Sequence, residues 1–554
     1  MPPENQAIPE ILRGYFWESV CLNSSDTDRT PLRIGVLANG MHLPACFAAV
    51  LDQISRCNFA RIAAVAFEPS ALSAETSTGA IAWSQFSRLA EQKSGEAAEI
   101  FRPIDCTRWL ADVSNFTEVG DLDVLLDFRK ETAPDTFDGS FARYGLWRYR
   151  YRDTERYPPG PPYFQEIYAN DPCSAVTLEA LTTEAPEGLI LHKLVASSVM
   201  GMWYGQNQIG PVVGAADMML CSLHRLHEKG WDAVKARSAP APGSVNRRVN
   251  STPGNITVAA YVAHRAAASV SARIQNSKRP IYHWRSAIRP DRSGEDLPDS
   301  VEGINEIATP VGTALADPFL LTHKGRLWLF VEQVFYHDRV GRLACAEIRS
   351  DGTPGEFTTI LDTGSHLSFP FVFEDGDSVF MIPESSAAGK VWLYRAVDFP
   401  YVWKMEKMLF PYAAVDTTLH VQDGVYWFFT CLADPPLGAK MALLFRSDSL
   451  FGQWIPHEAN PISSDIRYAR SSGRILRSHG RLIRQAQDGA LRYGHAIRFS
   501  QITKLTPSAY EEAPVSALIP EDNSGMLGIH TYDRAGGFEV FDYVQQEPIR
   551  GIAI

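Results

Sequence analysis

Two aspartates in the second half of the chain stand near the start of apolar stretches, where a carboxylate has no packing role. Asp317 lies in ADPFLL and Asp416 in AVDTTLHV, and between them His366 begins HLSFPFVF. Burying a carboxylate without a partner is costly, so these residues suggest a functional site. Carboxyl groups can transfer protons and bind sugar hydroxyls, which makes carbohydrate chemistry the first hypothesis. The simpler alternative for Asp317 is an Asp-Pro turn that caps its strand.

A repeated phrase supplies the elements that would position these residues. Its copies, in HKGRLWLFVE, EDGDSVFMIPE, QDGVYWFFTC, SHGRLIRQAQD and the fainter AGGFEVFDYV, surround Gly325, Gly376, Gly424, Gly480 and Gly536. Each copy is a glycine turn followed by alternating β-branched and aromatic residues, the pattern of a hairpin entering a strand. The copies recur at intervals of roughly 50 residues, the length of a four-stranded propeller blade. The sequence therefore predicts a five-bladed β-propeller over residues 279–545.

The innermost strand of each propeller blade lines the central channel, so equivalent positions of successive blades converge at the axis. We therefore expect Asp317, His366 and Asp416 to meet in one funnel, with Glu332 and Glu384 at its border. The opposite side is predicted to carry Arg470, Arg474, Gln485, Gln487 and His530. Guanidinium groups suit phosphate, diphosphate or uronate groups, so the expected ligand is a phosphorylated or acidic sugar.

The first half of the chain has the pattern of an α/β domain. Buried strands at residues 32–40 and 60–67 flank a helical stretch, as at the start of a parallel sheet. The predicted divisions are a loose lead-in at 1–31, an α/β domain at 32–235, a linker with an amphipathic helix at 236–278, and the propeller at 279–545. The predicted fold class is thus α/β plus all-β.

A cationic strand, WRYRYR, lies inside this domain. Arg148, Arg150 and Arg152 alternate with aromatic residues, so the arginines share one face of the strand. One interpretation is a solvated arginine face over a buried aromatic face. The other is a pocket in which Arg148 and Arg150 bind a phosphate or carboxylate.

Composition limits the class of protein. The chain is 45% hydrophobic with a net charge of −12 and no basic stripe, so we expect no nucleic-acid partner. Its apolar runs are too short to span a bilayer, and the N-terminus lacks the pattern of a secretory signal, so we expect a cytoplasmic protein. No motif predicts a metal or a cofactor. Basic residues in the helix after the linker, His264, Arg265 and Arg273, leave peripheral membrane association open, and oligomeric state is also open.

The stretch from YGLWRYRY to EGLIL resembles the core of the folate-dependent formyltransferases. Its frame is kept through Gly145, Gly160–Pro162, Asp171, Val176–Thr177 and Gly188. The positions of the family's catalytic Asn, His and Asp hold Arg148, Arg150 and Pro186 instead. Arginine is no base at neutral pH, and proline handles no protons. The resemblance therefore implies a formyltransferase-like parallel-sheet fold and argues against formyl transfer.

Asp317 and Asp416 resemble the general base and the pKa-tuning aspartate of five-bladed glycoside hydrolases of the arabinanase and β-xylosidase type. Where that family carries its acid, the sequence reads YARSSGRIL. An inverting hydrolase needs both an acid and a base. The resemblance therefore implies a hydrolase-like site that lacks its acid unless Glu384 or Glu332 supplies one.

A longer ordered run, from ADPFLL and MIPES through VDTTL and ARSSGR to GRLIRQAQD and YGHAIR, resembles the N-terminal domain of the plant glucosamine inositolphosphorylceramide transferases. Bacterial proteins join such a domain to a formyltransferase-like one. The resemblance implies a carbohydrate-active transferase whose substrates are a sugar nucleotide, a phosphosugar or a glycolipid, with Asp317 as base and arginines at the leaving phosphate. The alternatives are a non-catalytic glycan-recognition protein, a sugar N-formyltransferase and a glycoside hydrolase.

Overall fold

The computed structural model divides into two compact units, the first ending at Arg273 and the second beginning at Ile274. The structure describes residues 7–9, 12, 29–68, 81–93, 95–111, 113–115, 121–129, 142–158, 160–241, 253–277, 281–292, 294–432, 441–521 and 525–547. None of the described helices is long and apolar enough to cross a membrane.

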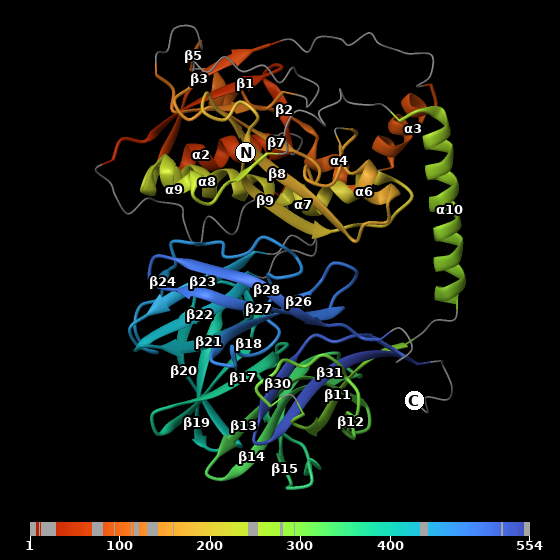
Figure 1. The fold of residues 1–554 in the computed structure, drawn as a ribbon, viewed down its shortest axis with the longest axis vertical. Coiled ribbons are helices and arrows are strands. Elements are labelled where there is room, and N and C mark those ends of the chain that lie inside the picture. Colours follow the sequence, from red (N-terminus) through yellow and green to blue (C-terminus); the bar gives the residue numbers. More distant parts are fainter. Residues whose placement is uncertain are drawn as a thin grey trace. The chain divides into compact units, whose positions relative to one another are not determined.

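The first unit contains an eight-stranded mixed sheet, in the order β10-β9-β8-β7-β6-β1-β3-β5 (Figure 1). Its strands are β1 (Leu32–Ala38), β3 (Ala60–Phe67), β5 (Ser114–Asn115), β6 (Val124–Asp127), β7 (Leu146–Arg150), β8 (Cys173–Leu181), β9 (Leu189–Ser197) and β10 (Ala239–Pro240). The five strands from β5 to β7 are parallel, as predicted, but β8, β9 and β10 pair antiparallel. The all-parallel sheet is thus corrected to a mixed one, and a formyltransferase-like fold stays a prediction.

Helices α2 (Ala45–Arg56) and α8 (Ala215–Lys229) pack against each other beside this sheet. Short elements connect the larger ones: β2 (His42–Pro44), β4 (Pro103–Asp105), α3 (Ile81–Gln92), α4 (Glu96–Ile100), α5 (Thr107–Leu110), α6 (Phe164–Tyr168), η4 (Tyr204–Gln208), α7 (Ile209–Val213) and α9 (Trp231–Lys235).

The amphipathic helix is α10 (Asn255–Ser277). Its buried Tyr261 packs on Phe164 and Tyr204 in an aromatic cluster of the first unit. Arg265 is 3% exposed and donates hydrogen bonds to the carbonyl oxygens of Gly201 and Met200 and to Asn170 Oδ1. His264 Nε2 also lies 2.7 Å from Asn170 Nδ2, so two of the three basic residues that suggested a membrane surface are engaged within the first unit.

The second unit contains five sheets of four or five strands each, which confirms the five-bladed β-propeller. Blade one contains β13 (Thr313–His323), β14 (Arg326–Phe335), β15 (Gly341–Ile348) and β16 (Thr358–Leu361), and blade two contains β17 (Ser368–Asp375), β18 (Ser378–Glu384), β19 (Val391–Asp398) and β20 (Val402–Phe410). Blade three contains β21 (Ala414–Gln422), β22 (Val425–Leu432), β23 (Ala442–Ser447) and β24 (Ile455–Pro456). Blade four contains β25 (Leu476–Ser478), β26 (Arg481–Asp488), β27 (Ala496–Leu505) and β28 (Tyr510–Leu518). The repeated glycines lie at the turns that join the first two strands of these blades, as predicted; Gly325, for example, has φ 76° between His323 and Arg326, which pair across the turn.

The fifth blade is closed by strands from both ends of the unit. It contains β11 (Ile281–Pro290), β12 (Asn305–Glu306), β29 (Met526–Gly528), β30 (Tyr532–Ala535) and β31 (Phe538–Glu547). β11 pairs antiparallel with β31 from Ile281↔Glu547 to Pro290↔Phe538, so the propeller's first strand completes its last blade. Arg289 and Glu539 form a buried ion pair of 2.6 Å across this junction. The closure holds the inner strands in a fixed ring, and this ring positions the site.

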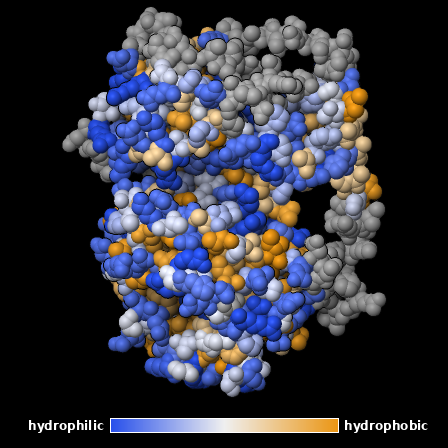
Figure 2. All heavy atoms as spheres, viewed as in Figure 1, coloured by the Kyte–Doolittle hydropathy of each residue, from blue (hydrophilic) through white to orange (hydrophobic). Residues whose placement is uncertain are grey.

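Large apolar side chains are also exposed on the second unit, and Figure 2 shows orange groups of them on the face in view. Four belong to the outer part of the second blade: Val397, Val402, Met405 and Met408. In β20, Lys404 and Lys407 lie between these exposed apolar residues. Lysines on an outer strand discourage pairing with another sheet edge.

Candidate functional site at the propeller axis

The inner strands of three blades carry the same local distortion. The pairing register shifts between Ala316 and Phe319 in β13, and corresponding shifts occur in β17 and β21. Within these bulges Asp317, Phe369 and Asp416 have positive φ values of 49°, 44° and 48°. Non-glycine residues rarely adopt this conformation, and such strain concentrates at functional sites. The residue equivalent to the two aspartates is therefore Phe369, and not His366.

Asp317 joins three blades at the axis. Its Oδ2 accepts a hydrogen bond from the Phe369 amide of the second blade (3.0 Å), and its Oδ1 accepts one from the Thr531 hydroxyl of the fifth (2.7 Å). Its own amide donates to Asp542 Oδ2 at 2.9 Å. The residue is 4% exposed, and burial raises the pKa of Asp317 although nearby His530 opposes this. Asp317 therefore lies where the first, second and fifth blades meet.

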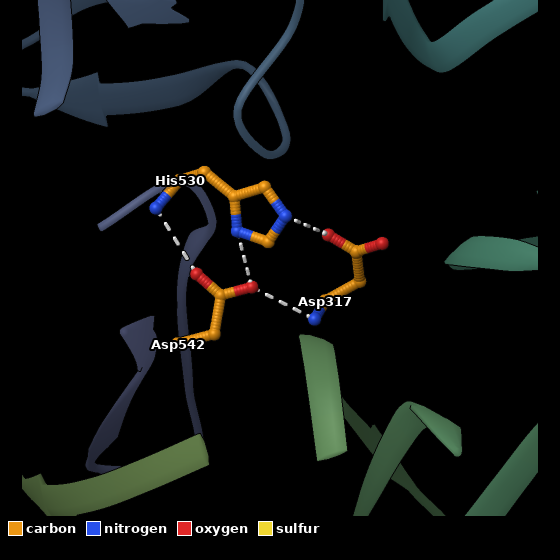
Figure 3. Close-up of side chains that lie close together, drawn as sticks. All are labelled: Asp317, His530 and Asp542. Carbon is orange, nitrogen blue, oxygen red and sulfur yellow. Dashed lines mark hydrogen bonds and ion pairs between the residues drawn. The ribbon is translucent and has the colours of Figure 1, made fainter. Parts of the chain in front are cut away.

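His530 lies between two carboxylates (Figure 3). Its Nδ1 is 2.6 Å from Asp542 Oδ2, and its Nε2 is 3.5 Å from Asp317 Oδ1. Burial lowers the pKa of His530, but the charges of Asp542 and Asp317 outweigh burial, so the pKa is raised overall. These three residues offer ligand atoms within 4.8 Å of one another and could hold a metal ion. Because both ring nitrogens face carboxylates, a protonated imidazole offsets one of the two negative charges.

Asp416 is held by the opposite side of the funnel, as the sequence predicted for Arg470 and Gln487. Arg470 Nε and Nη2 donate to Asp416 Oδ2 and Oδ1 at 2.5 and 3.1 Å, and Gln487 Nε2 donates to Oδ2 at 2.6 Å. Burial raises the pKa of Asp416 to about 6, although Arg470 lowers it. Gln487 Oε1 is buried and has no hydrogen-bond partner within the described part of the chain. It is a buried acceptor available to a ligand hydroxyl.

Glu332 and Glu384 occupy matching places in the second strands of blades one and two. Each pairs with the residue just before the bulge of the inner strand: Glu332 with Ala316, and Glu384 with Ser368. Glu384 accepts hydrogen bonds from the hydroxyls of Ser386 (2.5 Å) and Ser368 (3.0 Å), and Arg470 Nη2 is 3.6 Å away. Both glutamates therefore lie in the same cluster as Asp317 and Asp416, as predicted.

His366 lies beside Glu332, with its Nε2 3.2 Å from Glu332 Oε1. Its side chain is 43% exposed, compared with 9% for Glu332. His366 thus belongs to the same cluster as predicted, but at its solvent-facing edge.

The site also contains aromatic residues that the sequence did not predict. Trp284 stacks on His530 with ring centroids 3.9 Å apart. Tyr493, 53% exposed, meets both rings edge-on, and the Arg470 guanidinium lies 5.0 Å from its centroid. Exposed aromatic rings beside carboxylates suit the apolar faces and hydroxyls of sugars.

Asp542 was also missed, because the repeat does not place it at the same spacing as the other residues. It follows Gly536 by six residues, whereas Glu332 and Gln487 follow Gly325 and Gly480 by seven. Because side chains alternate along a strand, this difference of one residue predicts the opposite face, so the turn spacing alone did not identify Asp542.

Arg474 and Gln485 are placed differently from the other predicted residues. Arg474 pairs with Asp533 through contacts of 2.6 and 2.9 Å and donates to the Leu320 carbonyl oxygen. Gln485 Nε2 donates to the carbonyl oxygens of Arg474 and Tyr532. Both side chains therefore tie blades together, and the guanidinium of Arg474 is already balanced.

The arginines of strand β7 in the first unit are buried and not solvated. Arg148 and Arg150 are each 6% exposed, and both donate from Nε to Glu179 Oε2 at 3.0 Å. Strand β7 is buried along its whole length, because the arginine face is covered as well as the aromatic face. The solvated-face interpretation is therefore wrong, and any anion pocket at Arg148 and Arg150 would compete with Glu179.

Comparison with known proteins finds relatives of the second unit. Residues 303–535 match the family model described as glucosamine inositolphosphorylceramide transferase 1, N-terminal. The propeller resembles this domain. Glucosamine inositolphosphorylceramide transferase 1 of Arabidopsis thaliana is 37% identical over 217 residues, 38% of this chain and 28% of the plant protein. The protein of the same name from Oryza sativa subsp. japonica is 36% identical over 216 residues, 38% of this chain and 29% of that protein. The chain therefore matches less than a third of the length of these plant relatives.

Two solved structures with a related fold are carbohydrate-active enzymes. The RS223 β-xylosidase has a TM-score of 0.32 and 12% identity, covering 44% of this chain and 97% of its own. The α-L-arabinanase of Cellvibrio cellulosa, complexed with arabinohexaose, has a TM-score of 0.29 and 10% identity, covering 36% of this chain and 77% of its own.

Proposed function

We propose that this protein transfers a glycosyl group, and that the sugar head group of a glycolipid or an activated sugar binds at the propeller axis. The observation that carries the proposal is the convergence of Asp317, Asp416 and Glu384 with Arg470 and His530 in one partly open cluster. Carboxyl groups of this kind supply proton transfer and bind sugar hydroxyls. The plant relatives, named as glucosamine inositolphosphorylceramide transferases, support a glycolipid and a sugar donor as substrates.

The charge of the funnel favours the sugar over the phosphate as the group that enters it. The charges of four other carboxyl groups act on Glu332 there: those of Asp317, Glu384, Asp416 and Asp542. The nearby cations, Arg470 and His530, are both engaged by these acids, and Arg474 is paired with Asp533. Hydroxyls or an amine suit such a site better than a diphosphate does. The sequence-based role of the arginines at a leaving phosphate is therefore replaced by sugar recognition.

Asp317 is the proposed base for the acceptor hydroxyl. A carboxylate has about four lone-pair sites, and the hydrogen bonds to Asp317 use one on Oδ2 and one on Oδ1, with His530 Nε2 at 3.5 Å from Oδ1. One site on Oδ2 remains for an acceptor proton. The raised pKa of Asp317 strengthens it as a base, and the neighbouring His530 cation helps to keep it ionised. Asp416 and Arg470 then orient the sugar, with Tyr493 at the rim.

The test is a transfer assay with the full chain, an inositolphosphorylceramide acceptor, and two donors: a nucleotide-activated glucosamine and a glycoside of glucosamine. Mass spectrometry detects the glycosylated lipid. Asp317→Asn should lower product formation by about 10²–10⁴-fold, the usual contribution of a general base. The exposed Asp351 of the same propeller provides a matched Asp→Asn control that should retain activity. Equal product from all three proteins would contradict the proposal.

Glycan recognition without catalysis is a second candidate, and a specific observation favours it. Asp317 and Asp416 each accept hydrogen bonds on both carboxylate oxygens, as structural aspartates do. In that case the same sugars would stabilise the protein against heat, while no donor would give product with the wild-type chain.

A further inference from the structure

Glu332 and Glu384 are equivalent in position but opposite in surroundings. Glu384 receives two serine hydroxyls and faces Arg470, a set of donors that suits a carboxylate. Glu332 has one neighbouring donor group in the described part of the chain, the ring of His366. Paired acids whose surroundings differ in this way commonly divide the roles of proton donor and charged group.

The excess of acidic groups at the axis also indicates that Glu332 is the protonated acid. Two cations cannot neutralise five buried carboxyl groups, and an unbalanced buried charge is costly. The acid with the fewest donors is the cheapest to protonate. Burial, together with the charges of Asp317 and Glu384, raises the pKa of Glu332 well above its usual range. The groups that face it are Asp317, Glu384, Asp542, Asp416, Tyr493 and His366.

The tautomer of His366 is fixed by its second contact. Its Nδ1 accepts a hydrogen bond from the Gly341 amide at 3.0 Å, so in the neutral ring the proton is on Nε2, the nitrogen that lies 3.2 Å from Glu332 Oε1. The proton of Glu332 then belongs on Oε2. A side chain at position 341 would disturb this pair, because its Cβ would lie 2.4 Å from Glu332 Oε1 and 2.9 Å from His366 Cε1.

From this geometry we infer that Glu332 is a further catalytic residue of the site, the acid that protonates the leaving oxygen, and that His366 is its positioning residue. The inference rests on the proposed function and names its substrate class. A phosphate leaves without a proton, whereas an alcohol oxygen needs one. The donor is therefore a glycoside, and the bond broken joins its anomeric carbon to an alcohol oxygen.

The step balances as a single displacement. The acceptor oxygen forms a bond to the anomeric carbon while the bond to the leaving oxygen breaks. The acceptor's proton goes to Asp317, and the proton on Glu332 Oε2 goes to the leaving oxygen, which departs as an alcohol. Afterwards Asp317 loses its proton to solvent and Glu332 regains one from solvent beside the half-exposed His366.

Infrared spectroscopy of the full chain tests the inference without a substrate. At pH 7 we expect the carbonyl band of a protonated carboxylic acid, which Glu332→Gln removes and the exposed control Glu356→Gln retains. His366→Gln keeps Glu332 and removes an imidazole donor, so the band should persist to higher pH; this variant carries the test if Glu332→Gln does not fold. Absence of the band, or a band unaffected by both Glu332→Gln and His366→Gln, overturns the inference whatever the fate of the proposed function.

A leaving-group comparison tests the catalytic role. With 4-nitrophenyl and methyl glucosaminides as donors, Glu332→Gln should lower kcat/KM about 10²–10⁴-fold for the methyl glycoside and less than about 10-fold for the nitrophenyl glycoside, whose leaving group needs no proton. Equal losses for both donors overturn the role of Glu332. If neither donor reacts with the wild-type chain while the infrared band is present, the proposed function fails and the protonated Glu332 stands.

Discussion

Each unit of this molecule buries arginine against carboxylates, but the two clusters differ in their exposure to solvent. In the first unit Arg148 and Arg150 share one oxygen of Glu179 and are 6% exposed. At the propeller axis five carboxyl groups share one arginine and one histidine, and the Arg470 side chain is 20% exposed. A covered cluster inside a sheet supports structure, whereas an acid excess that reaches solvent leaves a proton and acceptor sites for a ligand. The comparison favours the propeller as the location of the proposed function.

The largest effect is expected from Asp416→Asn at the axis. Loss of the charge that holds Arg470 should lower kcat/KM for transfer by about 10²–10⁴-fold, equivalent to roughly 3–5 kcal/mol. Steady-state kinetics measures the loss, and circular dichroism checks the fold. Retention of full activity would mean that Asp416 has no part in the reaction.

Glu179→Gln breaks the corresponding cluster in the first unit. It removes the carboxylate that two buried guanidinium groups share, and breaking a buried pair costs about 3–5 kcal/mol. Chemical denaturation should show this loss, while transfer activity below the unfolding transition stays within about threefold of wild type. If activity instead falls as far as with Asp416→Asn, the first unit takes part in the chemistry and the comparison breaks.

The pH dependence of stability tests whether the acids at the propeller axis hold protons in the folded chain. Glu332 binds its proton more tightly in the folded chain, because its pKa is raised above the ordinary 4.5, so unfolding releases a proton. Stability therefore falls as pH rises from about 4.5 toward the folded-state pKa, by at most about 1.4 kcal/mol per pH unit. Asp416 adds a loss of the same sign up to about pH 6. Denaturation curves measured at several pH values give the free energy of unfolding as a function of pH. Above pH 6 this free energy should fall less steeply with pH in Glu332→Gln than in the wild type, and an equal fall in the two proteins would contradict the account.

Tyr493→Ala gives the smallest expected effect. The ring is 53% exposed at the rim, so its removal should leave folding intact and weaken sugar binding by about 1 kcal/mol, or roughly fivefold in KM. Tyr493→Phe should retain most of the binding, because the ring remains. If the two variants behave alike, the hydroxyl and not the ring is important.

The repeat made much of the site predictable. Turns spaced by one blade placed Asp317, Asp416, Glu332 and Glu384 on a common frame, and these residues do converge. The frame failed at His366, because a bulge inserts a residue locally and its position cannot be read from alternation. Phe369 is the true equivalent, and His366 reaches the cluster from outside the strand.

Pairing was much harder to predict than position. The sequence indicated that Arg470 and Arg474 face the channel, but not that Asp416 and Asp533, each more than 50 residues away, neutralise them. The same limit applied to Arg148 and Arg150, since Glu179 lies on a neighbouring strand. Strand direction was also hidden: alternation identifies β8 and β9 as strands but does not distinguish antiparallel from parallel pairing.

Hydrogen–deuterium exchange of the full chain, with and without a soluble glucosamine-bearing inositol phosphate head group, tests the central claim most directly. If the sugar binds at the propeller axis, added head group should slow exchange in peptides from β13, β17 and β21 and in the segment around Arg470. Peptides from β7 and β8 of the first unit should be unchanged. Protection confined to β7 and β8, with none in the inner strands of the propeller, would contradict the account.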